Sequence, residues 1–335
     1  MGAEVTTVAD DEVVIYDGAD VRRYEGLAPD TEHDLDGLTV RTQARPGSEL
    51  LCRFATVNDV HFGETECGLL EGYDLGPVFT SDPGDDPYPE IMNRGAIAEI
   101  SALDPVAVVV KGDLTAWGTV AEYERFLAFY GDAFGSKLHH VRGNHDAYFG
   151  GTFAAEAPFV VDVPGARLAV LDTTIPGSET GRVTASTLEW LDDVGAEATH
   201  DGVPLLVFGH HHVWSPLSKS RADRYFGINP DDSERLIDVA ARRAAFFGYF
   251  AGHTHRNRVR RFPATGDKPW VEVACVKDFP GSWAEYRVFD DGVMQVHRRI
   301  STDEALAWTE KTRGMFGGAY TDYAFGALED RNFIV

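Results

Sequence analysis

The chain has 335 residues, of which 44% are hydrophobic and 25% are charged, a balance typical of globular proteins with a sizeable buried core. Its formal net charge of −24 argues against a nucleic-acid polymer as partner, because affinity for such polymers comes largely from Lys and Arg side chains that neutralise phosphates. No apolar run approaches the roughly 20 residues of a membrane span, and the N-terminus resembles no secretory signal, so we expect a cytoplasmic protein without a membrane partner.

Residues 1–50 are predicted to form a small N-terminal β extension. The segment is acidic, and two short strand-like runs, 12–18 and 38–44, flank a turn-like stretch. Fifty residues are too few to predict an independent domain with its own core. We therefore expect this extension to lie on a main domain that spans residues 51–300.

The main domain begins with an alternation of short apolar runs and amphipathic stretches. The runs predicted as strands are 54–59, 106–113, 137–144, 167–174, 204–211 and 246–253. The stretches predicted as helices are 88–103, 119–134, 184–199 and 231–245. This alternation predicts an α/β layered fold with a buried sheet, and ligands of such folds bind just past the carboxyl ends of the strands.

The last third of the chain starts with three further strand-like runs, 270–278, 284–291 and 293–300. The last two are joined by a tight turn, and we expect the series to add a second sheet layer. Residues 301–335 open with a helix-like stretch and are expected to form a C-terminal tail packed on the domain.

Potential metal ligands follow five of the six strands predicted between residues 54 and 253. They are Asp59 and His61, then Asp113, then Asn144, His145 and Asp146, then His210, His211 and His212, and finally His253 and His255. Two residues at a spacing of two share one face of an extended strand, as two ligands of one cluster require. Each group alone is typical of an ordinary turn, but their joint occurrence after successive strands favours one shared site.

The chemistry of this set indicates the kind of metal. It combines carboxylate, imidazole and amide groups without a thiolate, which suits Mn, Fe, Zn or Co in a reactive centre better than a structural zinc. Seven or eight ligands are too many for one ion. We therefore predict two divalent metal ions that share a carboxylate, and the residues leave the identity of the metals open.

Three consecutive histidines at the end of the run 205–209 leave open which of them binds a metal. His210 is the first residue past the predicted strand and is preferred as the ligand. His211 would then point to the opposite side, and His212 would share the face of His210 only if the strand continued.

The ordered motifs resemble those of the calcineurin-like metallophosphoesterase superfamily, and most closely its bacterial branch of cyclic-nucleotide and glycerophosphodiester phosphodiesterases. They are Asp59-x-His61, Gly112-Asp113, Gly143-Asn144-His145-Asp146, Gly209-His210 and Gly252-His253-Thr254-His255, and the resemblance covers roughly residues 54–262. It implies an α-β-β-α sandwich with two mostly buried sheets.

The resemblance also implies a role for each residue. Asp59, His61 and His255 would hold one metal, Asn144, His210 and His253 would hold the other, and Asp113 would bridge the two ions. His145 would face the scissile phosphate without binding metal, and Asp146 would orient it.

The predicted function is hydrolysis of a small phosphate ester, preferably a phosphodiester of the cyclic-nucleotide or glycerophosphodiester type, by a metal-bridging hydroxide. A phosphomonoesterase and a non-catalytic scaffold on the same fold are alternatives, and the complete ligand set disfavours the scaffold. A nuclease is disfavoured by the acidic balance. The substrate and the oligomeric state stay open, with a homodimer as one option.

Selectivity is expected to depend on three loops, 62–90, 147–157 and 213–235. Aromatic residues in or near them are candidates for stacking on a base, namely Tyr73, Phe79, Tyr148, Phe149 and Trp214. Arg142 and Arg256 are candidates for contact with the substrate phosphate.

Overall fold

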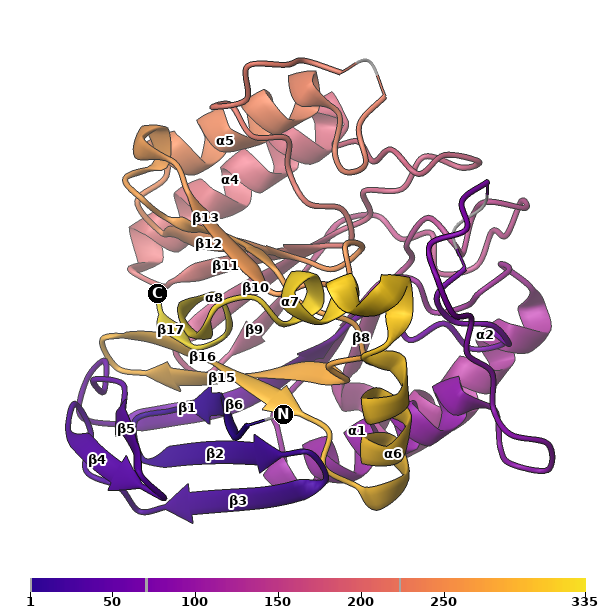
Figure 1. The fold of residues 1–335 in the computed structure, drawn as a ribbon. Coiled ribbons are helices and arrows are strands. Elements are labelled where there is room, and N and C mark those ends of the chain that lie inside the picture. The colour runs from indigo at the N-terminus through magenta and orange to yellow at the C-terminus, as the bar shows by residue number, and fades with distance from the viewer. Residues whose placement is uncertain (1, 70–71, 223) are drawn as a thin grey trace.

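The computed structural model describes residues 2–69, 72–222 and 224–335, which form two six-stranded sheets and a set of helices (Figure 1). The strands of the first sheet are β9 (Phe159–Val163), β10 (Ala166–Leu171), β11 (Leu205–Gly209), β12 (Phe246–Ala251), β13 (Arg258–Arg261) and β14 (Pro269–Glu272). Those of the second are β6 (Leu50–Val57), β7 (Val108–Lys111), β8 (Leu138–Val141), β15 (Ser282–Phe289), β16 (Gly292–Arg299) and β17 (Phe333–Ile334). Their orders are β13-β14-β12-β11-β10-β9 and β17-β16-β15-β6-β7-β8.

Helices cover the outer faces of both sheets. The helices are α1 (Tyr88–Leu103), α2 (Val120–Phe126), α3 (Asp132–Phe134), α4 (Ala185–Asp201), α5 (Pro230–Arg242), α6 (Asp303–Thr312), α7 (Ala319–Phe325) and α8 (Leu328–Arg331). Figure 1 shows α4 and α5 on one side of the paired sheets and α1 and α6 on the other. Separate apolar clusters join each helical layer to its sheet. The predicted α-β-β-α sandwich is therefore confirmed.

Short helical turns continue some of these elements. They are η1 (Leu127–Gly131), η2 (Gly135–Lys137), η3 (Pro263–Thr265) and η4 (Met315–Gly318). The helix predicted over 119–134 is thus α2, a π-helical turn and α3 in sequence. Within the described part of the chain, no helix is both long enough and apolar enough to cross a membrane.

The core between the sheets is built from fully buried aromatic and β-branched side chains. Phe54 of β6 stacks on Tyr286 of β15 with ring centroids 4.6 Å apart. Phe208 of β11 stacks on Phe250 of β12 at 5.2 Å, and these rings meet the first pair edge to face. Each such side chain contributes on the order of 1.5–3 kcal/mol by leaving water. This interior fixes the two sheets against each other, and with them the strand ends that carry the polar residues.

The six strands predicted in the first part of the chain all form, but they divide between the two sheets. β6, β7 and β8 are parallel in the second sheet, and β10, β11 and β12 are parallel in the first. The expectation that residues 270–300 add one second layer is wrong in part. β14 pairs with β12 in the first sheet, whereas β15 and β16 lie in the second. β14 is buried along its whole length, so its pattern did not indicate which sheet it would join.

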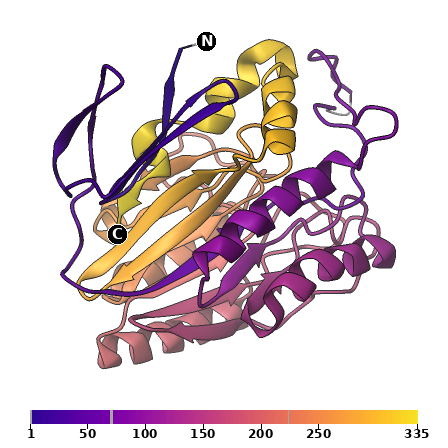
Figure 2. The ribbon, with the colours of Figure 1, turned by 90° about the horizontal axis from the view of Figure 1, so that it is seen from below.

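The N-terminal segment forms more strands than its sequence pattern predicted. β1 (Glu4–Val8), β2 (Glu12–Asp17) and β3 (Asp20–Glu25) make an antiparallel sheet, and β4 (Glu32–Leu35) pairs with β5 (Leu38–Arg41). Figure 2 shows these strands beside the sheet that contains β15 and β16. The Thr7 and Tyr16 hydroxyls each donate a hydrogen bond of 2.6 Å to backbone carbonyls at the end of β16. β3 is largely exposed and polar, so a search for apolar runs does not find it.

Candidate metal centre

All seven predicted ligands gather where strands of the two sheets end side by side. Asp59 and His61 follow β6, Asp113 follows β7, Asn144 follows β8, His210 follows β11, and His253 and His255 follow β12. Six of them are buried, and His255 is partly exposed. These residues therefore gather at the strand ends, and their roles as metal ligands stay predictions.

A first group contains Asp59, His61 and His255. One ligand atom of each residue lies within 4.8 Å of the others. His255 Nε2 is 3.5 Å from Asp59 Oδ1, and His61 Nε2 is 3.6 Å from Asp113 Oδ2. This arrangement offers two imidazoles and a carboxylate to one cation. The Asp113 carboxylate lies at the edge of this first group.

A second group surrounds His210. Its Nε2 atom lies 3.0 Å from Asn144 Oδ1 and 3.2 Å from Asp113 Oδ2. The His253 ring stands 5.1 Å from the His210 ring, centroid to centroid. The same Asp113 oxygen thus faces His61 in the first group and His210 in the second. A shared carboxylate between two neighbouring groups is the geometry that a pair of metal ions needs.

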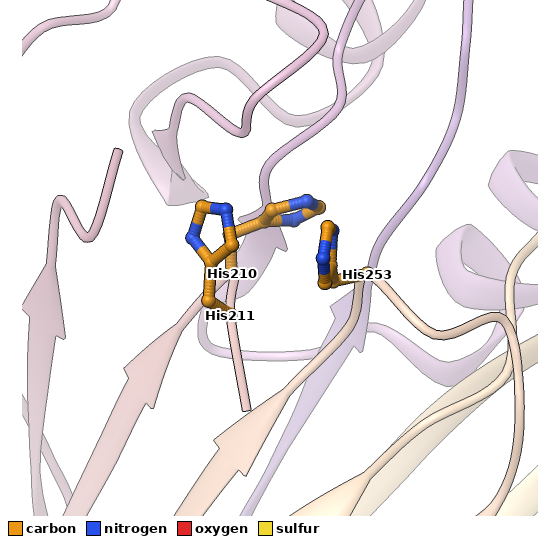
Figure 3. A group of neighbouring side chains, drawn as sticks. All are labelled: His210, His211 and His253. Carbon is orange, nitrogen blue, oxygen red and sulfur yellow. The ribbon is translucent and has the colours of Figure 1, made fainter. Parts of the chain in front are cut away.

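The three consecutive histidines take different positions, and one differs from expectation. His211 does not point to the opposite side, because β11 ends at Gly209 and strand alternation stops there. Figure 3 shows its ring gathered with those of His210 and His253, and these three residues offer ligand atoms within 4.8 Å of one another. His211 Nδ1 is 2.7 Å from Thr173 Oγ1, while His212 contacts the Tyr225 hydroxyl at 2.9 Å.

Several buried imidazole nitrogens in the cluster have no hydrogen-bond partner among the residues that the structure describes. They are both ring nitrogens of His61 and the Nε2 atoms of His211 and His253. Burial lowers the pKa of each of these three histidines well below its ordinary value, with nearby cationic groups adding to the effect. A neutral imidazole with a free lone pair is the form that binds metal. Because unpartnered buried polar atoms are costly, these residues fit a bound cation.

Asp113 and His210 are a close buried pair in the cluster, with Asp113 Oδ2 3.2 Å from His210 Nε2. Burial opposes ionisation of both, but each stabilises the charged form of the other. The pKa of Asp113 is therefore held well below its usual range, and that of His210 is raised to about 9. His210 Nδ1 donates to the Lys111 carbonyl at 2.8 Å, which leaves Nε2 as the atom facing Asp113. A cation bound here would displace the Nε2 proton.

The backbone at the site adopts an unusual conformation. Five of the predicted ligands, which are not glycines, have positive φ: Asp59 (54°), His61 (48°), Asp113 (50°), His253 (69°) and His255 (53°). Such left-handed conformations cost on the order of 1–3 kcal/mol each and persist where the surroundings impose them, typically at functional sites. Here the chain turns sharply after β6, β7 and β12 and directs side chains from all three turns into one cluster.

Two motif glycines are explained by close packing against these side chains. A Cβ atom on Gly143 would lie 2.3 Å from Asp113 Oδ1, and one on Gly252 would lie 2.7 Å from Asp59 Oδ2. Any larger residue at either position would displace a carboxylate of the cluster.

His145 stands beside the cluster, but its orienting partner is not the predicted one. Its Nδ1 atom lies 2.9 Å from the carbonyl oxygen of Ala116, which is the acceptor for an Nδ1–H. Asp146 instead accepts hydrogen bonds from the backbone of Leu114, Thr115 and Gly143. The prediction that Asp146 holds the His145 ring is therefore wrong. Asp146 ties together the loops that follow β7 and β8, and burial together with the Asp113 charge raises its pKa to about 6.

Residues behind the first group were missed in the sequence. Glu64 Oε2 lies 3.4 Å from His61 Nδ1, and Asp278 Oδ2 lies 3.8 Å from His255 Nδ1. The Lys277 ammonium is 2.6 Å from Glu64 and 3.6 Å from Asp278, so one cation connects both carboxylates. Carboxylates in this position orient metal-binding histidines. Only the proximity of Glu64 to His61 was visible in the sequence, since residues 277 and 278 reach the site through the fold.

The arginine and aromatic residues predicted to contact substrate lie in different surroundings. Arg142 Nε is 2.8 Å from Asp172 and Arg256 Nε is 2.9 Å from Glu272, so both guanidinium groups are engaged by carboxylates. Trp214 is buried and Phe79 packs against the core. Tyr148 and Phe149 line a pocket next to His61 and His145, whereas Tyr73 is exposed outside it.

Comparisons with known proteins agree with this geometry. The model of the calcineurin-like phosphoesterase family matches residues 52–257. A cAMP/cGMP dual specificity phosphodiesterase of Mycobacterium tuberculosis is 34% identical over 166 residues, which are 46% of this chain and 50% of that protein. A glycerophosphodiester phosphodiesterase of Enterobacter lignolyticus is 27% identical over 177 residues, 49% of this chain and 61% of the relative. The chain thus spans roughly half the length of these relatives.

A solved structure shows a similar fold. A dimetal phosphatase from Danio rerio superimposes with a TM-score of 0.56 at 16% sequence identity, covering 75% of this chain and 98% of that one. This likeness agrees with the layered sandwich.

Proposed function

Because the chain belongs to the calcineurin-like phosphoesterase family, we propose that it is a metal-dependent hydrolase of small phosphate esters, with phosphodiesters as the preferred class. The observation that carries the proposal is the position of Asp113, whose Oδ2 atom faces His61 at 3.6 Å and His210 at 3.2 Å. The names of two relatives, a cyclic-nucleotide and a glycerophosphodiester phosphodiesterase, support the diester preference.

The proposed ligand assignment divides the cluster into two sites. Asp59, His61 and His255 would hold one ion, Asn144, His210 and His253 would hold the other, and Asp113 would serve both. The free lone pairs of His61 and His253 support this assignment. His211 is a further candidate for the second site, since its Nε2 atom is also unpartnered. Two bound divalent ions of Mn, Fe, Zn or Co would supply a hydroxide nucleophile near neutral pH and offset charge on the phosphate oxygens.

The side chains around the cluster have proposed roles of their own. His145 donates its Nδ1 proton to the Ala116 carbonyl, so the proton it can exchange with substrate lies on Nε2. This places it to protonate the leaving alcohol. Asp146 maintains the loops that present Asp113 and Asn144. In a chain with a net charge of −24, the bound cations would provide the local positive field that attracts phosphate.

A phosphomonoesterase on the same site is the second candidate, and a scaffold without activity is the third. The completeness of both ligand groups disfavours the scaffold, because a non-catalytic role needs neither the buried lone pairs nor the strained backbone.

The test is hydrolysis of p-nitrophenyl esters by protein stripped with a chelator and then supplied with Mn²⁺. We expect no turnover of bis(p-nitrophenyl) phosphate by the stripped protein, recovery on addition of Mn²⁺, and a higher kcat/KM for this diester than for p-nitrophenyl phosphate. The control is buffer with the same Mn²⁺ concentration. A higher kcat/KM for the monoester would support the second candidate, and no turnover of either ester would refute the proposal.

A further inference from the structure

A pocket of about 290 Å³ opens directly beside the candidate metal centre. Its lining includes His61 of the first group and His145, the proposed acid. The remaining lining residues are Glu64, Thr65, Glu66, Leu69, Ala116, Trp117, Tyr148 and Phe149. Since the pocket begins at His145, it lies on the side of the scissile bond where the leaving group would be protonated.

The wall of this pocket is aromatic and unusually exposed. Trp117 is 55% exposed and Phe149 is 70% exposed, although both are large apolar side chains. Their ring centroids are 5.8 Å apart, and the Tyr148 ring lies 6.3 Å from Phe149 and 5.0 Å from His145. A contiguous group of exposed aromatic rings next to a reactive centre is typical of a ligand-binding surface.

A hydrogen bond anchors the backbone of Trp117 in this wall. The Trp117 backbone N–H donates to Glu122 Oε2 at 3.1 Å, and the same carboxylate caps the start of α2 together with Thr119. The residue before Trp117 is Ala116, whose carbonyl holds the His145 ring. The proposed acid and the aromatic wall are therefore fixed by the same loop, which sets their relative position.

The pocket lining also contains two acidic side chains, Glu64 and Glu66. Glu64 is already paired with Lys277 at 2.6 Å, whereas Glu66 is exposed, and a carboxylate accepts hydrogen bonds but donates none. These carboxylates disfavour a leaving group that carries a second negative charge. They suit a neutral group with N–H or O–H donors.

We propose that this pocket selects esters whose leaving alcohol carries a planar aromatic ring, such as a nucleobase, and that Trp117 is the main determinant of that preference. The inference rests on the proposed phosphoesterase activity. The volume is close to the lower end of the roughly 300–1,000 Å³ found for ligand sites, which leaves room for a single ring system. Stacking on Trp117 and Phe149 provides the affinity, and the exocyclic donors of a base face Glu66.

The experiment compares 3′,5′-cyclic AMP with its abasic analogue, in which the same cyclic phosphodiester lacks the base. With Mn²⁺ present, we expect kcat/KM of the wild-type protein to be about 10-fold or more higher for cyclic AMP, the size of a typical base–aromatic stacking effect. Trp117→Ala is expected to remove this preference, because kcat/KM falls much more for cyclic AMP than for the abasic substrate, while Trp117→Phe retains most of the preference. Val120→Ala is the matched control, because Val120 is 64% exposed on the neighbouring helix and lies outside the pocket lining.

Three results would overturn the inference. One is equal kcat/KM for the two substrates in the wild-type protein. Another is an equal loss of kcat/KM on both substrates in Trp117→Ala, which would mean that Trp117 only supports the His145 loop. The third is hydrolysis of neither cyclic substrate. Failure of the proposed function itself is recognised separately, by the absence of turnover of bis(p-nitrophenyl) phosphate under the same conditions.

Discussion

Replacing His145 by alanine is expected to lower kcat for alkyl phosphodiesters about 10²–10⁴-fold, the usual contribution of a well-placed general acid. An alkoxide is a poor leaving group and needs a proton as the P–O bond breaks. We propose that His145 supplies this proton, because its Nδ1 atom is engaged by the Ala116 carbonyl at 2.9 Å and its side chain lines the pocket.

The same variant should behave differently with an activated ester. p-Nitrophenolate leaves without protonation, so His145→Ala is expected to retain most of the wild-type rate on bis(p-nitrophenyl) phosphate. This comparison separates an acid from a metal ligand, a distinction that matters because His145 lies close to His61 and Asp113. Mn²⁺ content is the control and should not change. An equal loss of kcat on both kinds of ester would contradict the assignment of His145 as the acid. A loss of bound Mn²⁺ would contradict it as well.

Replacing Glu285 by alanine is expected to destabilise the protein by about 3–5 kcal/mol, the cost of leaving buried charges unpaired. Glu285 is fully buried in β15 and accepts from Arg287 Nε at 2.9 Å and from Arg298 Nε at 3.0 Å. Arg298 also donates to Glu12 at 2.7 Å, and Arg287 donates to Asp11 at 2.6 Å, so this network joins the N-terminal strands to the second sheet. Chemical denaturation of the wild-type protein and the variant measures this decrease in the free energy of unfolding.

The matched control for this variant is Asp86→Ala. Asp86 pairs with Arg94 at 2.8 Å, but the two side chains are 58% and 49% exposed, so the change in unfolding free energy should stay below about 1 kcal/mol. A loss of similar size in both variants would contradict the assigned role of the buried network.

Acid should weaken the same network at a defined pH. Burial opposes ionisation of Glu285, but Arg298 and Arg287 lower its pKa from the ordinary 4.5 to about 2. The Glu285 carboxylate therefore binds a proton less readily in the folded state than in the unfolded state. Its contribution to the free energy of unfolding is present above pH 4.5 and is lost as the pH falls toward 2. This network supports our proposal that residues 1–50 are an extension of the main domain, residues 51–300. We also propose that residues 301–335 are a tail packed on that domain, since Trp308 and Tyr320 are buried in the same apolar cluster as residues of α1.

The gathering of the candidate ligands was predictable from sequence because these residues follow strands. Parallel strands in a layered fold bring their carboxyl ends together, so Asp59, Asp113 and His210 were expected to meet although they are far apart in the chain. The same reasoning failed for His211, since strand alternation applies only while the strand continues and β11 ends at Gly209. The sequence therefore predicts where residues just past a strand end lie, but it does not predict where their side chains point.

Contacts made through the backbone or through distant segments could not be predicted. The partner of His145 is a carbonyl oxygen of Ala116, and any residue can supply a carbonyl. Asp278 reaches His255 because the chain crosses from β14 in one sheet to β15 in the other, a crossing that apolar periodicity does not encode. Trp117 was not distinguished from core aromatic residues, because exposure is a property of the folded surface.

The most direct test of the dinuclear site is the number of Mn²⁺ ions bound per chain, measured by equilibrium dialysis for the wild-type protein and for Asn144→Ala. Asn144 Oδ1 lies 3.0 Å from His210 Nε2, and we propose it as a ligand of the second site alone. We therefore expect two ions per wild-type chain and one ion per chain of Asn144→Ala. The proposed dinuclear site would be contradicted by a wild-type protein that binds at most one Mn²⁺ ion. An Asn144→Ala variant that still binds two ions with unchanged affinity would also contradict it.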